Sequence, residues 1–157
     1  MLDCRIEGLE RKSPAVIIID RLFKIKRKLK IFKNKSRKIF IFTQTKNRQK
    51  EEYFKNIDVS VIKLKRSNKL KNNISEPYFF LKKLGFNRIL IESGVEYINE
   101  VLKHNLIRNF YLFKSSYNLK NNGKNNAKIN LIRKLKTTTK NKIKINLNGE
   151  SLHKIQL

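Results

Sequence analysis

The sequence predicts an α/β protein whose mixed sheet is flanked by helices. Apolar runs alternate with amphipathic segments along most of the 157 residues. The first of these runs, 15–20, is rich in β-branched residues, as expected for a strand buried on both faces. Two apolar stretches close the chain with no helical pattern between them, which is typical of an antiparallel edge.

Three strands are expected in the first half of the chain. They are 15–20 (A-V-I-I-I-D), 38–43 (K-I-F-I-F-T) and 58–64 (D-V-S-V-I-K-L). Pro14 precedes the first strand, and the third alternates between apolar and polar residues. The lysine-rich connection between the first two is expected to be a loop or a ragged hairpin. Residues 47–56 are polar, so a helix and a loop both remain open there.

A helix is expected next, from Glu76 to Leu84, because Tyr78, Phe79, Leu81 and Leu84 recur at helical spacing. Gly85 fits the residue that ends such a helix.

The second half is expected to begin with a short strand at 88–91, followed by a helix at about 95–104. The helix has Val95, Ile98, Val101 and Leu102 on one face. A strand at 109–114 and a loop at 115–126 come next. The closing stretches, 129–135 and 143–147, are expected to form an antiparallel hairpin.

The chain is strongly basic, with 38 lysines and arginines against 12 acidic residues and a formal charge of +26. Such a charge is typical of proteins that bind nucleic acid or anionic surfaces. The cations are mostly lysines, however, and they form no single stripe. A/T-rich codons would give the same excess of lysine, asparagine and isoleucine. We therefore favour a solvated surface and keep a nucleic-acid-binding protein as the alternative.

Several site types find no support in the sequence. Cys4 is the only cysteine, so no internal disulfide or cysteine cluster for zinc can form. His104 and His153 have no partner at metal-ligand spacing, and no metal is expected. No nucleophile–base pair, P-loop or dinucleotide motif is present. No run reaches transmembrane length and no signal-like core opens the chain, so a cytoplasmic protein is expected.

The junction at Glu92, Ser93 and Gly94 is the strongest candidate site. Ligands of open α/β sheets bind where strands end and helices begin, because free N–H groups there attract anions. A phosphate-bearing cofactor is therefore expected at this point. Ser93 and Glu96 also fit an S-x-x-E capping box, which would use the same N–H groups, and both roles remain open. Gly94 would allow a positive φ or a close backbone approach.

Three stretches in order resemble a known family. They are L-D-C-R-I-E-G-L-E-R-K-S-P-A-V-I-I-I-D at 2–20, L-G-F-N-R-I-L-I-E-S-G-V-E-Y at 84–97 and L-I-R-N-F-Y-L-F-K-S-S-Y-N-L-K-N-N-G at 106–123. The chain resembles the C-terminal reductase domain of the bacterial riboflavin-biosynthesis bifunctional deaminase/reductase, the RibD family. The order and spacing of the three stretches agree with those of the family across nearly the whole chain. The resemblance implies a dihydrofolate-reductase-like fold and one partial reductase domain over 1–157.

The resemblance also implies an activity and a set of site residues. The activity would be NADPH-dependent reduction of 5-amino-6-(5-phosphoribosylamino)uracil to its ribitylamino form. The substrate-binding residues would be Arg5 and Glu92, and no side chain is assigned a catalytic role. Arg21 would lie near the cofactor, and two interpretations of it remain open: it pairs with the 2′-phosphate, or it is a solvated residue at the end of a strand. The other cofactor-binding residues would be Leu2, Gly94, Val95, Glu96, Tyr97, Ile98 and Asn99.

The sequence departs from the family pattern in several places. Ser93 replaces the first of two glycines, and Arg21 and Arg108 replace residues that are usually polar or acidic. The deaminase domain and the opening strand and helix of the reductase are missing. A fragment, the second half of a split gene and a misassigned start all remain open as explanations. The expected partners are a missing N-terminal half or a deaminase, and a second copy in a homodimer.

Overall fold

The computed structural model describes residues 7–9, 12–33, 37–68, 70–115, 140–145 and 150–156. The chain divides into two compact units, Met1–Phe86 and Asn87–Leu157. Together they contain parallel and antiparallel sheets with helices, so the predicted mixed α/β class is confirmed. The prediction of one partial reductase domain over 1–157 stays a prediction.

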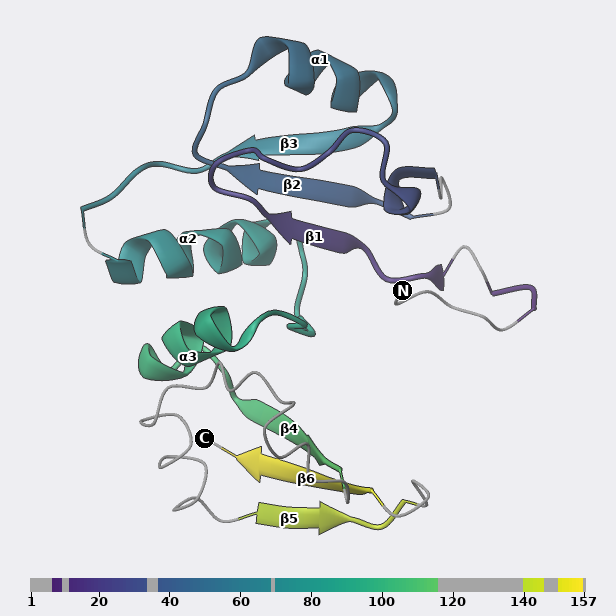
Figure 1. Cartoon of the computed structure of the whole chain (residues 1–157), viewed down its shortest axis with the longest axis vertical. Helices are drawn as coiled ribbons and strands as arrows, with labels where there is room; N and C mark the ends of the chain where they lie inside the picture. Colours follow the sequence, from purple (N-terminus) through teal and green to yellow (C-terminus); the bar gives the residue numbers. More distant parts are fainter. Residues whose placement is uncertain are drawn as a thin grey trace, which may run out of the picture. The chain divides into compact units, whose positions relative to one another are not determined.

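The first unit is built on a parallel sheet of three strands (Figure 1). Its strands are β1 (Val16–Ile19), β2 (Ile39–Thr43) and β3 (Val59–Lys63), in the order β1-β2-β3. Ile39 lies opposite Val16 on one side and opposite Val59 on the other. All three predicted strands of this half are therefore confirmed to within one or two residues at each end.

Helices α1 (Arg48–Asn56) and α2 (Leu70–Lys83) cover opposite faces of this sheet. Side chains of successive strand residues point to opposite faces, and the two apolar clusters follow that alternation. Ile41 of β2 packs in the cluster that contains Phe54 of α1, whereas Phe42 packs in the cluster that contains Leu81 of α2. The sheet is thus the middle of three layers.

Phe54 is the centre of the α1-side core and is fully buried. Its ring centroid lies 5.0 Å from that of Phe32 and 5.9 Å from that of Phe23. Phe32 belongs to a short 3-10 helix, η2 (Lys30–Lys33), in the lysine-rich connection that was expected to be a loop or hairpin. The apolar residues of this connection are what fix it to the sheet.

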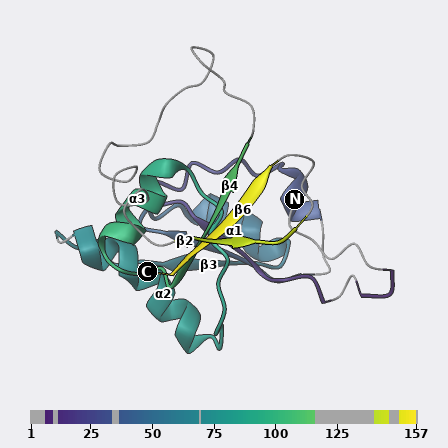
Figure 2. The same ribbon diagram turned by 90° about the horizontal axis from the view of Figure 1, so that it is seen from below.

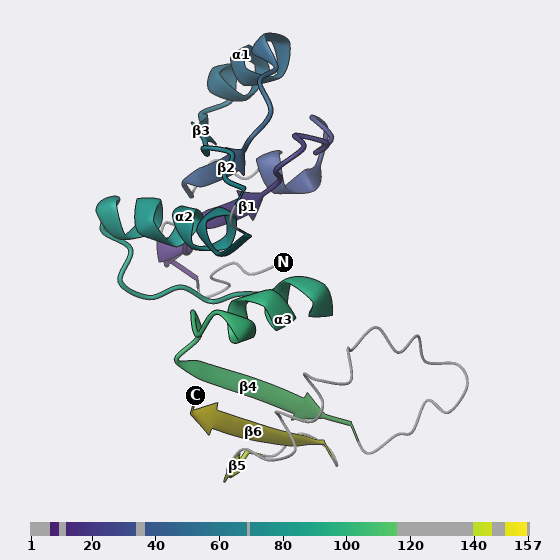
Figure 3. The same ribbon diagram turned by 90° about the vertical axis from the view of Figure 1, so that its left-hand side faces the viewer.

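The second unit contains helix α3 (Val95–Lys103) and an antiparallel sheet. The sheet consists of β4 (Asn109–Lys114), β5 (Lys140–Ile143) and β6 (Ser151–Gln156) in the order β4-β6-β5. Figures 2 and 3 show β6 running antiparallel beside β4. The predicted helix at 95–104 and the strand at 109–114 are confirmed.

Other predictions about the elements were wrong. Residues 88–91 form no strand, and Leu90 there is 68% exposed. Helix α2 begins at Leu70 rather than at Glu76. The last strand, β6, was missed, and β5 begins at Lys140 rather than at residue 143.

The remaining predictions about the elements have mixed outcomes. Residues 129–135 lie outside the described residues. The undecided segment 47–56 is helical over Arg48–Asn56. Within the described part of the chain, no helix is long and apolar enough to cross a membrane.

Candidate functional site

The carboxyl ends of the three parallel strands lie at the same end of the sheet, because the strands run in the same direction. This carboxyl end of the sheet is the first candidate location in the first unit. Arg21, just after β1, is joined to the residues that follow β2. Its carbonyl oxygen accepts hydrogen bonds from Oγ1 of Thr45 at 3.0 Å, from Oγ1 of Thr43 at 3.3 Å and from the N–H of Gln44 at 3.1 Å. Two neighbouring strand ends are therefore fixed to each other around the backbone of Arg21.

The turn after β1 is held by further hydrogen bonds. A carboxylate oxygen of Asp20 accepts from the N–H of Ile25 at 2.6 Å. Nζ of Lys50, from α1, donates to the carbonyl oxygens of both Phe23 and Ile25. Phe23 has a φ of +54°, in the left-handed region, and its side chain is buried. These contacts explain how the turn keeps a conformation that is unfavourable for a bulky residue.

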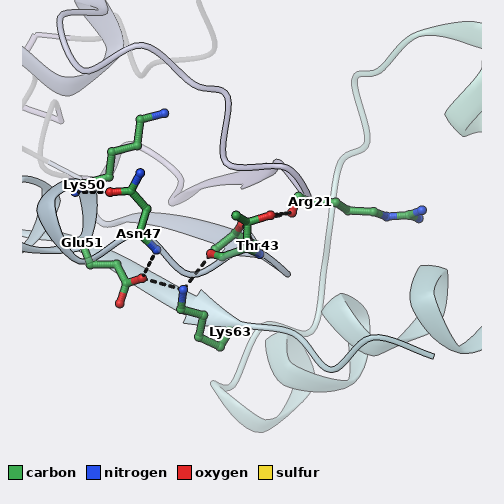
Figure 4. Close-up of polar contacts among 7 residues, drawn as sticks. Arg21, Thr43, Asn47, Lys50, Glu51 and Lys63 are labelled. Atoms are coloured by element: carbon green, nitrogen blue, oxygen red, sulfur yellow. Dashed lines mark hydrogen bonds and ion pairs between the residues drawn. The ribbon is translucent and has the colours of Figure 1, made fainter.

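The N-terminus of α1 is closed by the protein's own side chains (Figure 4). Oδ1 of Asn47 accepts from the N–H of Lys50 at 3.0 Å, and the N–H of Asn47 donates to Oε1 of Glu51 at 2.9 Å. Nζ of Lys63 also donates to this Glu51 oxygen, at 2.5 Å. The Lys63 bond and the Asn47 N–H together lower the pKa of the Glu51 carboxyl. This helix start is already occupied and offers little to an anionic ligand.

The connection from β3 to α2 is hydrogen-bonded to the same carboxyl end of the sheet through Asn73. Oδ1 of Asn73 accepts from Nε2 of Gln44 at 3.1 Å and from the N–H of Ser67 at 2.9 Å. Glu76, one helical turn further on, accepts from the N–H of Lys65 at 2.9 Å. All three strand ends therefore belong to one connected polar network.

The acidic groups at these strand ends and the Arg21 side chain are placed differently. The three acidic groups there, Asp20, Glu51 and Glu76, each accept hydrogen bonds from the protein's own N–H groups. The Arg21 side chain, in contrast, extends away from the network, as Figure 4 shows. Since guanidinium binds phosphate through several planar donors, Arg21 is the residue here best suited to hold a phosphate.

The start of α3 differs from that of α1. Its N-cap is Gly94, with φ −63° and ψ 157°, and this glycine makes no side-chain cap hydrogen bond. The Ser93 hydroxyl donates instead to the carbonyl oxygen of Gly94, at 3.4 Å. The predicted capping box between Ser93 and Glu96 is therefore wrong, because the helix begins one residue too late for it. The suggested positive φ at Gly94 is also wrong, and a Cβ there would meet no atom within 4 Å.

The other predicted site residues divide between the two units. Arg21 is half-buried in the first unit. In the second, Val95 is the first residue of α3, Glu92 and Glu96 are exposed, and the half-buried residues are Tyr97, Ile98 and Asn99. Leu2 and Arg5 lie outside the described residues. Glu92 to Asn99 therefore form one continuous segment, which leads into α3 and includes the first turn of that helix.

Among the described residues, the two best-formed cavities lie in the first unit, and no predicted site residue lines either of them. One, of about 330 Å³, lies along β3 beside Glu51 and Lys55. The other, of about 170 Å³, is lined by Phe32, Arg37 and Asn56 among others.

The sequence analysis missed the residues that build the first unit's strand-end network. Thr43 is fully buried, yet its hydroxyl donates to Arg21 and accepts from the N–H of Thr45 at 3.2 Å. A signal was present, since T-Q-T directly follows the apolar run of β2. Asn73 gave no such signal, because its partner after β2, Gln44, is 29 residues away in the sequence.

Comparison with known proteins decides the family. The family model described as the RibD C-terminal domain matches residues 1–127, more than half of the chain. The chain belongs to the RibD C-terminal domain family. No curated protein matches its sequence.

Solved structures with the same fold include two RibD-type enzymes. The RibD of Acinetobacter baumannii has a TM-score of 0.59 at 16% identity, over 89% of this chain and 36% of that one. A deaminase/reductase of Thermotoga maritima, described as a diaminohydroxyphosphoribosylaminopyrimidine deaminase/5-amino-6-(5-phosphoribosylamino)uracil reductase, has a TM-score of 0.68. Its identity is 16%, over 99% of this chain and 40% of that one.

A shorter relative has the same fold. A pyrimidine reductase-like protein of Corynebacterium diphtheriae has a TM-score of 0.65 at 15% identity, over 92% of this chain and 61% of that one. These likenesses confirm the expected dihydrofolate-reductase-like fold of the RibD C-terminal domain. This family member spans between about a third and three fifths of the length of these solved chains.

Proposed function

We propose that this member of the RibD C-terminal domain family contributes an NADPH-dependent reductase of riboflavin biosynthesis. Its substrate would be 5-amino-6-(5-phosphoribosylamino)uracil, the compound named in the description of the Thermotoga maritima relative. The observation that carries the proposal is the start of α3 at Gly94, an N-cap without a side-chain cap hydrogen bond, within the stretch that the family match covers.

The start of α3 fits a dinucleotide pyrophosphate. A helix N-terminus presents N–H groups and a partial positive charge to anions. The N-cap residue Gly94 makes no side-chain cap hydrogen bond, and a Cβ added at Gly94 would meet no atom within 4 Å. A phosphate can therefore approach the backbone closely. The helix has nine residues, so its dipole is developed.

The other residues have roles that follow from their chemistry and the family resemblance. Arg21 would hold the 2′-phosphate that distinguishes NADPH from NADH. Glu92, an exposed carboxylate, would accept hydrogen bonds from hydroxyl groups of the substrate. Arg5 would bind the substrate phosphate and Leu2 would contact the cofactor. The segment from Gly94 to Asn99 would carry the rest of the cofactor contacts.

NADPH, when bound, supplies the hydride for reduction of the ribosyl carbon. The chain's own contribution is positioning, since no nucleophile–base pair is assigned. Glu92 would fix the sugar and the α3 start would fix the pyrophosphate, which together set the approach of the reacting atoms. As further proposals, the chain is cytoplasmic, pairs into a homodimer and acts with a deaminase.

NADPH titration of the purified protein, followed by nicotinamide fluorescence, tests the proposal. The variant Gly94→Val places a branched side chain at the helix start, where the structure shows no clash with the protein. We expect unchanged circular dichroism and at least about a tenfold loss of affinity, equal to about 1.4 kcal/mol. Ser93→Ala is the matched control, because it leaves the backbone approach open. Equal NADPH binding by the wild type and Gly94→Val would refute the site.

A further inference from the structure

We infer that the connection between β1 and β2 binds the phosphate backbone of double-stranded DNA without regard to base sequence. The part that binds is residues 24–33, K-I-K-R-K-L-K-I-F-K, which we call the basic connection. The inference is independent of the reductase activity. It rests on the density of cations in the basic connection, on their exposure and on the packing that fixes the backbone that carries them.

The basic connection concentrates positive charge. Six of its ten residues are lysine or arginine, compared with 38 of 157 in the whole chain, and no acidic residue occurs between Asp20 and Glu51. All six cations are exposed, and none of them forms an ion pair with a residue that the structure describes. Their charge is therefore available to an anionic partner. The six are Lys24, Lys26, Arg27, Lys28, Lys30 and Lys33.

The backbone of the basic connection is fixed to α1. Phe32 is buried in the α1-side core, and Ile25 packs against the same cluster. Nζ of Lys50 donates to the carbonyl oxygen of Ile25 at 2.9 Å, and the hydroxyl of Tyr53 donates to that of Arg27 at 3.3 Å. Because this backbone is already fixed, a partner does not have to order it, which lowers the entropic cost of binding.

Arg27 is held in a position that suits a phosphate. Its guanidinium carbon lies 5.5 Å from the centre of the Tyr53 ring. A guanidinium over an aromatic face is attracted to the ring, while its planar donors can still bind phosphate oxygens. Lys50 and Lys63 differ, because their Nζ atoms donate to oxygens of the protein itself. The cations of the basic connection therefore differ from these lysines in availability.

The rest of the chain does not neutralise the basic connection. The second unit, 87–157, has 14 lysines and arginines against four acidic residues, and the first unit has 24 against eight. Each unit therefore has its own excess of cations. A second copy of the chain would bring another formal charge of +26 and would be repelled. The partner that fits is a separate polyanion.

The composition of the basic connection favours duplex DNA among polyanions. Its one aromatic residue, Phe32, is buried and offers no ring for stacking on single-stranded bases. It has no hydroxyl or amide side chain to recognise the 2′-hydroxyl groups of RNA. Ile25 and Ile31 are half-buried and Leu29 is 38% exposed, which leaves little apolar area to enter a bilayer. What remains is the sequence-independent attraction of lysine and arginine to the phosphates of a duplex.

Fluorescence anisotropy with the full chain and a short labelled DNA duplex tests the inference. If six cations contact phosphates, log K should fall with log salt concentration with a slope of about −5, or about a thousandfold between roughly 50 and 200 mM. The triple variant Lys26→Gln, Lys28→Gln, Lys30→Gln should have a slope of about −3 and bind about tenfold or more weakly at the lower salt.

The matched control is the triple variant Lys65→Gln, Lys82→Gln, Lys83→Gln. It removes the same charge from exposed lysines of the first unit that lie outside the basic connection. It should keep the wild-type slope and nearly the wild-type affinity, and both variants should keep the wild-type circular dichroism spectrum. Equal losses in the two variants would overturn the inference, because binding would then follow net charge and not one surface.

Acetylation of lysines in the wild-type protein, read by mass spectrometry, tests the same surface without any substitution. It decides the question even where a variant does not fold. The duplex should slow acetylation of the three lysines changed in the test variant and leave the three lysines of the control variant unaffected. Phosphatidylserine vesicles and a single-stranded RNA are the comparison arms. Stronger protection by either one at equal phosphate concentration would overturn the assignment to duplex DNA.

Discussion

Nζ of Lys63 lies 2.5 Å from Oε1 of Glu51, which joins the last residue of β3 to the first turn of α1. The same carboxylate oxygen accepts the backbone N–H of Asn47, the N-cap residue. One acidic side chain therefore links a strand, a helix and the turn between β2 and α1. The consequence for stability depends on pH.

We expect Glu51→Gln to lower the free energy of unfolding at neutral pH by about 0.2–1 kcal/mol, the range of partly exposed ion pairs. The pKa of Glu51 is lowered from its ordinary value of 4.5 in the folded protein. Its stabilisation is therefore full above pH 4.5 and is lost as the pH falls through the folded-state pKa. Urea unfolding from pH 7 to 3 should show the difference from wild type shrinking. Glu52→Gln, which removes the carboxylate of an exposed neighbour, is the matched control for the loss of one charge.

Asn47→Ala should destabilise the first unit by about 1 kcal/mol, because it removes the acceptor for the Lys50 N–H. Asn47→Asp keeps that acceptor and serves as the control. Thermal unfolding followed by circular dichroism measures both. If alanine and aspartate have equal effects, the Asn47 side chain does not act as a helix cap.

Phe54→Ala should cost about 3–5 kcal/mol, since it leaves a cavity among Phe23, Phe32 and Tyr53. That loss is comparable to the stability of a small domain, so much of the variant should be unfolded at room temperature. Phe79→Ala removes the same atoms from a side chain that is 58% exposed, and it should cost far less. Denaturant midpoints that are equal for the two variants would contradict the packing described for α1.

Arg21→Ala should weaken NADPH binding by about tenfold or more and leave NADH binding unchanged, because only NADPH carries the 2′-phosphate. Parallel titrations with the two cofactors measure the effect. Arg27→Ala removes a cation from the same connection without touching a strand end, and it should not discriminate between them. A proportional loss for both cofactors would assign Arg21 a structural role.

The formal charge of +26 predicts weak binding to an unrelated DNA duplex at low salt. Such binding should fall by orders of magnitude between about 50 and 200 mM salt if it reflects counterion release alone. Electrophoretic mobility shifts at both salt concentrations test this. Saturable binding that persists at the higher salt would favour the nucleic-acid-binding alternative.

The parallel sheet could be predicted well because its signal is local. Each strand is an uninterrupted apolar run, such as I-F-I-F of β2, and each is bounded by polar residues. Residues 88–91 carry a similar signal but form no strand. Hydrogen bonds of a strand come from a neighbour, and sequence alone does not show whether one is present. The exposed Leu90 is the result of an apolar run without a neighbour.

The elements that were missed have polar sequences. Among the residues of β6, S-L-H-K-I-Q, only Ile155 is buried, so the pairing with β4 and β5 defines the strand rather than its hydrophobicity. The first turns of α2 similarly contain lysine and two asparagines before the buried Ile74. In the candidate site, the start of α3 at Gly94 was predictable, whereas the strand expected before Glu92 does not form. The hydroxyl contacts around Arg21 depend on the alignment of β1 and β2.

The turn that carries Arg21 is immobilised before any ligand arrives, through Lys50, Thr43 and Thr45. A phosphate captured there would have to restrict only the arginine side chain. We therefore expect association at this corner to release heat with little change in heat capacity and little loss of chain entropy. A calorimetric profile of that form would distinguish a preformed anchor from a loop that folds around its ligand.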